Sequence, residues 1–176
     1  MLLPLLLAAA ASQPVSLRDF EAALAKNDSA TAALRDWCEA RAIANPAVIH
    51  AERITGPAPR PPAGLRKVLG IPPAEAVGYR HVKLTCGGTV LSEAHNWYVR
   101  SRLTGAMNQL LDSTDTPFGK VVAPLGFRRE AIRTVAGCDG PCPARTISTH
   151  RALLRLPDGR PLALVIEHYT PANLAD

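Results

Sequence analysis

Two long extended segments joined by a pair of glycines constrain the fold more than any other feature of this sequence. Residues 76–86 and 89–99 are rich in β-branched and aromatic side chains, and only Gly87-Gly88 separates them, which is typical of a tight β-hairpin. A second pair of extended segments, 147–156 and 161–169, is joined by a four-residue turn that contains proline and glycine. Because successive hairpins build antiparallel sheets, the sequence predicts a mainly antiparallel sheet.

The remaining elements are predicted from hydrophobic periodicity. Apolar residues at helical spacing predict helices at 16–25, 28–43, 65–69 and 103–111, and short apolar runs predict strands at 48–54 and 127–135. The chain of 176 residues has no linker long enough to separate domains. We therefore expect an α+β fold, a mainly antiparallel sheet flanked by helices, in a single domain over residues 15–176.

The first 14 residues resemble a signal peptide. An apolar run, MLLPLLLAAAA, is followed by Ser12, Gln13 and Pro14, and it is too short to cross a bilayer as a helix, so no stable membrane insertion is expected. No lysine or arginine precedes the run, so an ordinary N-terminal helix is the alternative. A cleaved leader predicts a periplasmic or secreted protein, and an uncleaved one predicts a cytoplasmic protein.

The four cysteines are Cys38, Cys86, Cys138 and Cys142. In an oxidising compartment Cys138 and Cys142 could close a tight loop, because the residues between them include Gly-Pro, and Cys38 and Cys86 would remain as the second pair. The alternative is four reduced and mostly buried thiols. Zinc is the weakest interpretation, because a Cys-x3-Cys spacing without a second nearby pair is a poor ligand set.

The charge distribution favours a small ligand over a polymer. The sequence has 20 basic and 15 acidic residues, a net charge of +5, and the basic residues are scattered along the chain. A nucleic-acid-binding surface would require them to cluster. A modest positive balance fits a small anionic ligand, and we expect a monomer that binds no nucleic acid. Arg128 and Arg129 are interpreted as solvated charges at the start of a strand.

Alternation along the strands places one arginine and one glutamate among apolar side chains. Arg80 shares a face with Val82 and Leu84, and Glu167 shares a face with Val165. A guanidinium on an apolar face needs a partner, and a buried carboxylate has a raised pKa unless it is paired. Either Arg80 and Glu167 form a structural ion pair, or both face an enclosed pocket where the arginine binds a ligand carboxylate and the glutamate transfers a proton.

Several short motifs follow one another in a specific order, and Walker, GxGxxG, HExxH and Ser-His-Asp patterns are absent. The motifs are Asp28-Ser29-Ala30-Thr31, Tyr79-Arg80 before Cys86-Gly87-Gly88, Asp115-Thr116-Pro117-Phe118-Gly119, Pro157-Asp158-Gly159-Arg160-Pro161-Leu162, and Glu167-His168-Tyr169-Thr170-Pro171-Ala172. Their order resembles that of the chorismate lyase family, enzymes that form 4-hydroxybenzoate and pyruvate from chorismate, over about residues 28–174.

This resemblance implies a role for each matching residue. Arg80 would bind a ligand carboxylate, Glu167 would act as acid, base or hydrogen-bond partner, and the backbone N–H of Phe118 would help to hold the ligand. Ala30 would form part of the pocket wall. His95 stands where many members of the family have a second arginine, although a lone histidine is more often a core or surface residue than a catalyst. The family needs no metal and no cofactor.

Three functions are consistent with these observations. The first is a lyase that eliminates pyruvate from chorismate. The second is a binding module, because the same fold resembles the effector-binding (UTRA) domains of bacterial transcription regulators, in which the pocket senses a ligand without converting it. The third is a secreted protein that has kept the fold and lost the chemistry.

Overall fold

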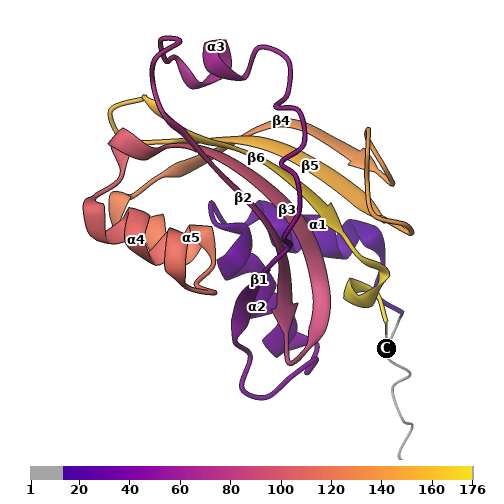
Figure 1. Ribbon diagram of the computed structural model, residues 1–176. Coiled ribbons are helices and arrows are strands. Elements are labelled where there is room, and N and C mark those ends of the chain that lie inside the picture. Colours follow the sequence, from indigo (N-terminus) through magenta and orange to yellow (C-terminus); the bar gives the residue numbers. More distant parts are fainter. Residues whose placement is uncertain (1–13, 176) are drawn as a thin grey trace, which may run out of the picture.

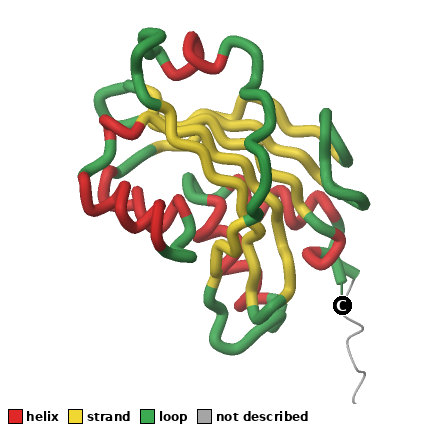
Figure 2. The backbone as a smooth tube through the Cα atoms, in the orientation of Figure 1, coloured by secondary structure: helices red, strands yellow, loops and turns green. Residues whose placement is uncertain are grey.

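The computed structural model describes residues 14–175, and the predicted leader lies, except for Pro14, outside the described residues. The strands form one six-stranded sheet in the order β1-β2-β3-β6-β5-β4, and every neighbouring pair is antiparallel (Figures 1 and 2). The strands are β1 (Ile49–Arg53), β2 (Val77–Cys86), β3 (Thr89–Val99), β4 (Arg128–Ala136), β5 (Ser148–Arg155) and β6 (Pro161–Tyr169). The predicted α+β architecture is confirmed.

The helices of the described residues lie close to their predicted positions, with two differences. They are α1 (Leu17–Ala25), α2 (Ala30–Ala40), α3 (Leu65–Leu69), α4 (Gly105–Ser113) and α5 (Phe118–Val122), with 3-10 turns at Arg100–Arg102, Ala123–Leu125 and Pro171–Asn173. Helix α2 ends three residues before the predicted Ile43, because Ala42 has a left-handed backbone (φ 50°) that cannot continue a right-handed helix. Helix α5 was not predicted; it is a single short turn that begins directly after Pro117 and has no side-chain N-cap.

The predicted glycine hairpin is confirmed. Gly87 (φ 55°) and Gly88 (φ 82°) both have positive φ, as the tight turn between β2 and β3 requires. A register shift between Leu84 and Thr85 then bends β2 near this end.

Helices cover the two faces of the sheet unequally (Figure 1). We call the face that carries Val82, Ala94 and Val165 the inner face; α1 and α2 pack on one part of it and α4 and α5 on another. The opposite, outer face carries Trp97 and is covered in part by α3. The inner face therefore contributes to two of the hydrophobic clusters.

Both candidate disulfides are present, and the alternative of four reduced thiols is wrong. Cys38–Cys86 joins α2 to the end of β2, and Cys138–Cys142 closes a short loop between β4 and β5. Among residues 14–175, no helix is sufficiently long and apolar to cross a membrane.

Candidate functional site

A buried ion pair lies at the centre of the inner face. The guanidinium of Arg129 on β4 contacts the carboxylate of Glu167 on β6 with Nη2–Oε2 at 2.5 Å, and the two side chains are only 14% and 6% exposed. The hydroxyl of Tyr169 donates to the same carboxylate at 3.0 Å. Burial is the largest single influence on the pKa of Arg129 and lowers it, but the charge of Glu167, its hydrogen bond to the guanidinium, and the smaller contributions of Tyr169 and Asp28 together outweigh burial. The net pKa is raised, so this arginine stays protonated. Burial, followed by the charge of Glu167, raises the pKa of Tyr169 well above its ordinary value.

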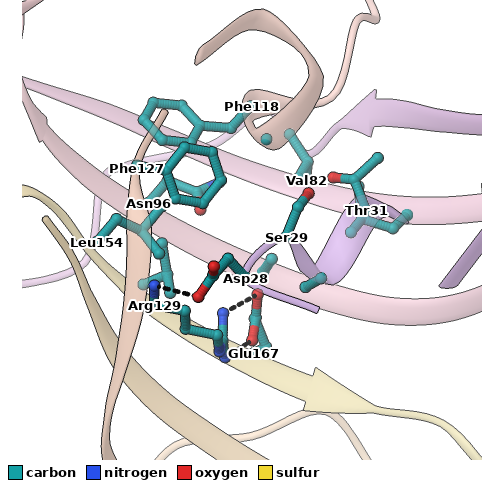
Figure 3. Close-up of a pocket in the computed structure, with 15 residues that line it drawn as sticks. Asp28, Ser29, Thr31, Val82, Asn96, Phe118, Phe127, Arg129, Leu154 and Glu167 are labelled. Atoms are coloured by element: carbon teal, nitrogen blue, oxygen red, sulfur yellow. Dashed lines mark hydrogen bonds and ion pairs between the residues drawn. The ribbon is translucent and has the colours of Figure 1, made fainter. Parts of the chain in front are cut away.

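A second carboxylate approaches the same arginine from the start of α2. The backbone N–H of Arg129 donates to Asp28 Oδ1 at 2.9 Å. Asp28 is positioned by the N-terminal end of α2, where the Ser29 side chain accepts from the backbone N–H of Ala32 and begins the helix. Arg129 thus lies between two carboxylates, one from the sheet and one from the turn that leads into α2 (Figure 3).

Helix α5 approaches α2 closely because of one glycine. A Cβ built on Gly119 would lie 2.6 Å from Ser29 Oγ and 3.0 Å from Thr31 Oγ1. A side chain at this position would force Ser29 or α5 to move, so the glycine permits the close contact that brings Phe118 beside the N-terminal end of α2.

These groups enclose a small cavity of about 30 Å³. Its polar side is formed by Asp28, Arg129 and Glu167, and the rings of Phe118 and Phe127 lie on the other side (Figure 3). The remaining lining residues are Ser29, Ala30, Thr31, Val82, Leu84, Ala94, Asn96, Gly119, Leu154 and Val165. A volume of this size holds about one or two water molecules.

A larger hollow of about 350 Å³ lies beside the small cavity. Asp28, Ala30 and Arg129 line both, so the arginine stands between them. The hollow is also lined by His150, and burial is the main cause that lowers the pKa of this histidine. The other lining residues are Glu21, Leu24, Ala25, Asn27, Ala131, Thr134 and Tyr169.

Three residues assigned from the family resemblance meet at one place. Ala30 from α2, Phe118 from α5 and Glu167 from β6 all line the small cavity, although Ala30 and Glu167 are 137 positions apart in the sequence. The motif order therefore located three parts of one cavity wall.

Arg80 lies on the same face of the sheet but does not contact Glu167. Its guanidinium donates to the carbonyl oxygens of Thr116 at 2.9 Å and Thr114 at 3.1 Å, and its Nε is buried without a hydrogen-bond partner. Burial lowers the pKa of Arg80. The predicted ion pair between Arg80 and Glu167 is wrong, because Arg129 takes the place of Arg80. In the structure Arg80 fixes the segment that leads into α5.

Arg129 is the residue of this candidate site that the sequence analysis missed. Its interpretation as a solvated charge is wrong, because its side chain is buried between β6 and the start of α2. One signal was available: Phe127 lies two residues earlier and is buried, so alternation along β4 places Arg129 on the same covered face.

His95 does not line this cavity. It alternates with Ala94 and Asn96, which line the cavity on the inner face, so its side chain lies on the outer face. There His95 Nδ1 lies 2.8 Å from the Tyr79 hydroxyl. Burial, followed by the nearby His81 and His168, lowers the pKa of His95 to about 4.

Comparison with curated proteins identifies a relative. The uncharacterized protein y4mC of Sinorhizobium fredii is 38% identical over 173 residues, which cover 88% of this chain and 73% of that protein. The chain belongs to the y4mC family. No family model matches the sequence.

Two solved structures show the same fold. The effector domain of PhnF from Mycobacterium smegmatis superposes with a TM-score of 0.57 and 15% identity, covering 82% of this chain and 90% of that chain. The structure of PhnF itself gives 0.55 and 16%, covering 84% of this chain and 65% of that chain. At this identity the likeness establishes the fold, which chorismate lyases and UTRA domains share. Membership of the chorismate lyase family itself is not confirmed.

Proposed function

We propose that this protein binds a small molecule that carries a ring and a carboxylate, with the carboxylate at Arg129 and the ring in the adjacent hollow. The observation that carries the proposal is the position of the buried Arg129–Glu167 pair. The pair lines a cavity that has aromatic walls, and Arg129 also lines the neighbouring hollow of about 350 Å³. A cavity that combines apolar walls with a few convergent polar groups is the usual form of a small-molecule site.

The chemistry of the guanidinium supports a carboxylate. Arginine has five N–H donors, and two nitrogens of Arg129 contact Glu167, so donors remain for a ligand. In a site of low dielectric constant, hydrogen bonds between a guanidinium and a carboxylate are strong. Arg80 adds a second buried positive charge on the same face, and its hydrogen bonds go to uncharged carbonyl groups.

A lyase that acts on chorismate is the second candidate, favoured by the convergence of Ala30, Phe118 and Glu167 on one cavity. In that reaction the C–O bond to the enolpyruvyl side chain breaks, the ring loses a proton as it becomes aromatic, and the departing enolpyruvate takes up a proton to become pyruvate. Glu167 would take or hold the proton lost by the ring, and the enclosed site would exclude water.

The cellular compartment helps to decide between ligand binding and the lyase reaction. Two disulfides support an oxidising environment and therefore an exported protein. Chorismate is a cytoplasmic metabolite, so export favours binding over the lyase reaction. N-terminal sequencing of the protein after cell fractionation tests this directly, since a cleaved chain recovered outside the cytoplasm supports the binding function.

Calorimetry with 4-hydroxybenzoate tests the binding function, with 4-hydroxybenzyl alcohol as the matched ligand that lacks the carboxylate. We expect saturable binding of the acid, binding of the alcohol at least tenfold weaker, and loss of the preference for the acid in the double variant Arg129→Gln/Glu167→Gln. Equal affinity for both ligands, or no binding of either, would contradict the proposal. Incubation with chorismate separates the second candidate, because only a lyase releases pyruvate and 4-hydroxybenzoate in equal amounts.

A further inference from the structure

A cluster of potential metal ligands lies on the outer face, on the other side of the sheet from the ligand cavity. His81, Glu93 and His95 each offer one ligand atom, and these atoms lie within 4.8 Å of one another. His81 Nε2 is already 2.7 Å from Glu93 Oε1, and the rings of His81 and His95 are stacked with centroids 4.1 Å apart.

The register of the sheet produces this cluster. His81 on β2 lies directly opposite His95 on β3, and Glu93 lies two residues before His95, so all three side chains leave the same face. Opposite residues of an antiparallel pair have Cβ atoms about 5 Å apart, a spacing at which two imidazoles can reach one ion. His168 on β6 lies directly opposite Glu93 and adds a third imidazole to the same patch.

Hydrogen bonds from neighbouring residues orient the imidazoles of His95 and His168 in a way that suits metal binding. When Nδ1 of His95 donates to the Tyr79 hydroxyl, 2.8 Å away, Nε2 is left with its lone pair. The hydroxyl of Thr149 donates to the Gly137 carbonyl at 2.8 Å, so it accepts from Nδ1 of His168 at 3.2 Å. Metal-binding histidines are usually oriented by such a hydrogen bond from the second ring nitrogen.

The ligand set indicates the metal. We propose that His81, Glu93 and His95 form a site for Zn²⁺ or a closely related divalent transition metal. Two imidazoles and one carboxylate are a known zinc ligand set, in which the fourth position stays open for water or another ligand. His95 also lines a hollow of about 230 Å³ beneath the Cys138–Cys142 loop, which gives that position space.

Binding requires only a small rearrangement. Zinc ligands lie about 2.0–2.2 Å from the metal, so ligand atoms in a tetrahedral site are roughly 3.3 Å apart. His81 Nε2 and Glu93 Oε1, now 2.7 Å apart, must move slightly apart, and the metal replaces the proton between them. The other ligand atoms, which lie no more than 4.8 Å from one another, must move closer together. The side chains of His81 and Glu93 are 20% and 19% exposed, so the ion reaches the site from solvent.

Calorimetric titration of the full, oxidised chain with Zn²⁺ tests the site, after dialysis against a chelator. We expect one Zn²⁺ per chain, and we expect Co²⁺ to give the visible absorption of a tetrahedral site. Glu93→Gln and His95→Gln should each weaken binding at least tenfold. His50→Gln is the matched control, because His50 is an exposed histidine on β1 and should leave binding unchanged.

Thermal unfolding in the presence of chelator shows whether each variant is folded. Glu93→Gln keeps its shape and is partly exposed, so it remains informative if a histidine variant does not fold. Zinc should raise the melting temperature of the wild-type chain and of His50→Gln, and should leave that of Glu93→Gln nearly unchanged. Equal zinc affinity in the wild-type chain and Glu93→Gln, or no zinc binding by the wild-type chain, would overturn the proposal.

Discussion

Arg129 and Glu167 meet on the inner face although they belong to β4 and β6, with β5 between them in the sheet. The pair therefore links three strands, and the backbone N–H of Arg129 extends the link to α2 through Asp28. Its two charges are nearly removed from water, so each depends on the other for stabilisation.

Removal of one charge of this pair should be costly. Glu167→Gln leaves a buried guanidinium without its main partner, and we expect a loss of about 3 kcal/mol or more in the free energy of unfolding. The double variant Arg129→Gln/Glu167→Gln should lose less, because it leaves no unpaired charge. Urea denaturation measures both. As a control, Asp36→Ala breaks the exposed Arg35–Asp36 pair and should cost less than about 1 kcal/mol; equal costs for the buried and exposed pairs would contradict the interpretation.

Gly119→Ala should disturb the contact between α5 and α2. The added methyl group would lie 2.6 Å from Ser29 Oγ, and overpacking of this kind typically costs about 1–3 kcal/mol. Gly105→Ala is the matched control, because a Cβ there meets nothing within 4 Å and the residue lies in the first turn of α4. Thermal unfolding compares the two, and a Gly119→Ala protein as stable as the wild type would show that α5 can move away from α2.

The two disulfides should differ in their contribution to stability. Cys38–Cys86 closes a loop with a sequence separation of 48, and Cys138–Cys142 closes one with a separation of 4. The chain-entropy model gives about 4 kcal/mol for the first and about 2 kcal/mol for the second. Denaturation of the double variants Cys38→Ala/Cys86→Ala and Cys138→Ala/Cys142→Ala measures the difference. A greater loss from the short loop would indicate that strain or contacts, and not chain entropy, dominate.

Stability should fall in acid partly because of His150. Burial is the main cause that lowers the pKa of His150 below the ordinary 6.5. Above pH 6.5 the histidine is neutral in both states and adds no pH dependence. As the pH falls below 6.5, the unfolded chain takes up a proton that the folded chain resists, so the unfolded state is favoured until the folded pKa is reached.

The variant His150→Gln isolates this contribution. The difference between its unfolding free energy and that of the wild type should be constant above pH 6.5 and should change in favour of the variant at lower pH. Urea titrations at a series of pH values measure it. Parallel stability profiles for the two proteins would show that His150 titrates normally in the folded state.

The sequence predicted the elements of the sheet well and the interior of the site less well. Strands 89–99 and 161–169 were predicted at their observed bounds, because alternation and turn residues are local signals. Alternation also placed Arg80 and Glu167 correctly on one face. Local patterns do not determine which strands become neighbours. The partner of Glu167 was therefore expected to be Arg80 on β2, whereas it is Arg129 on β4.

The outer cluster illustrates the same limit. His81 and His95 lie 14 positions apart in the sequence, and their opposition follows only from the register of the glycine hairpin. Glu93 lies two positions before His95 on the same strand face, but its contact with His81 depends on side-chain conformations that alternation does not determine.

The sheet order has a consequence for folding. β1 to β3 form one meander and β4 to β6 another, and only the β3–β6 pairing joins them, through residues such as Ala94 and Glu167 that are 73 positions apart in the numbering. Until that pairing forms, β3 and β6 are additional unpaired edges that can associate with another chain. Slow closure of such distant contacts makes the half-folded chain prone to aggregation, so the yield of refolding should depend on protein concentration.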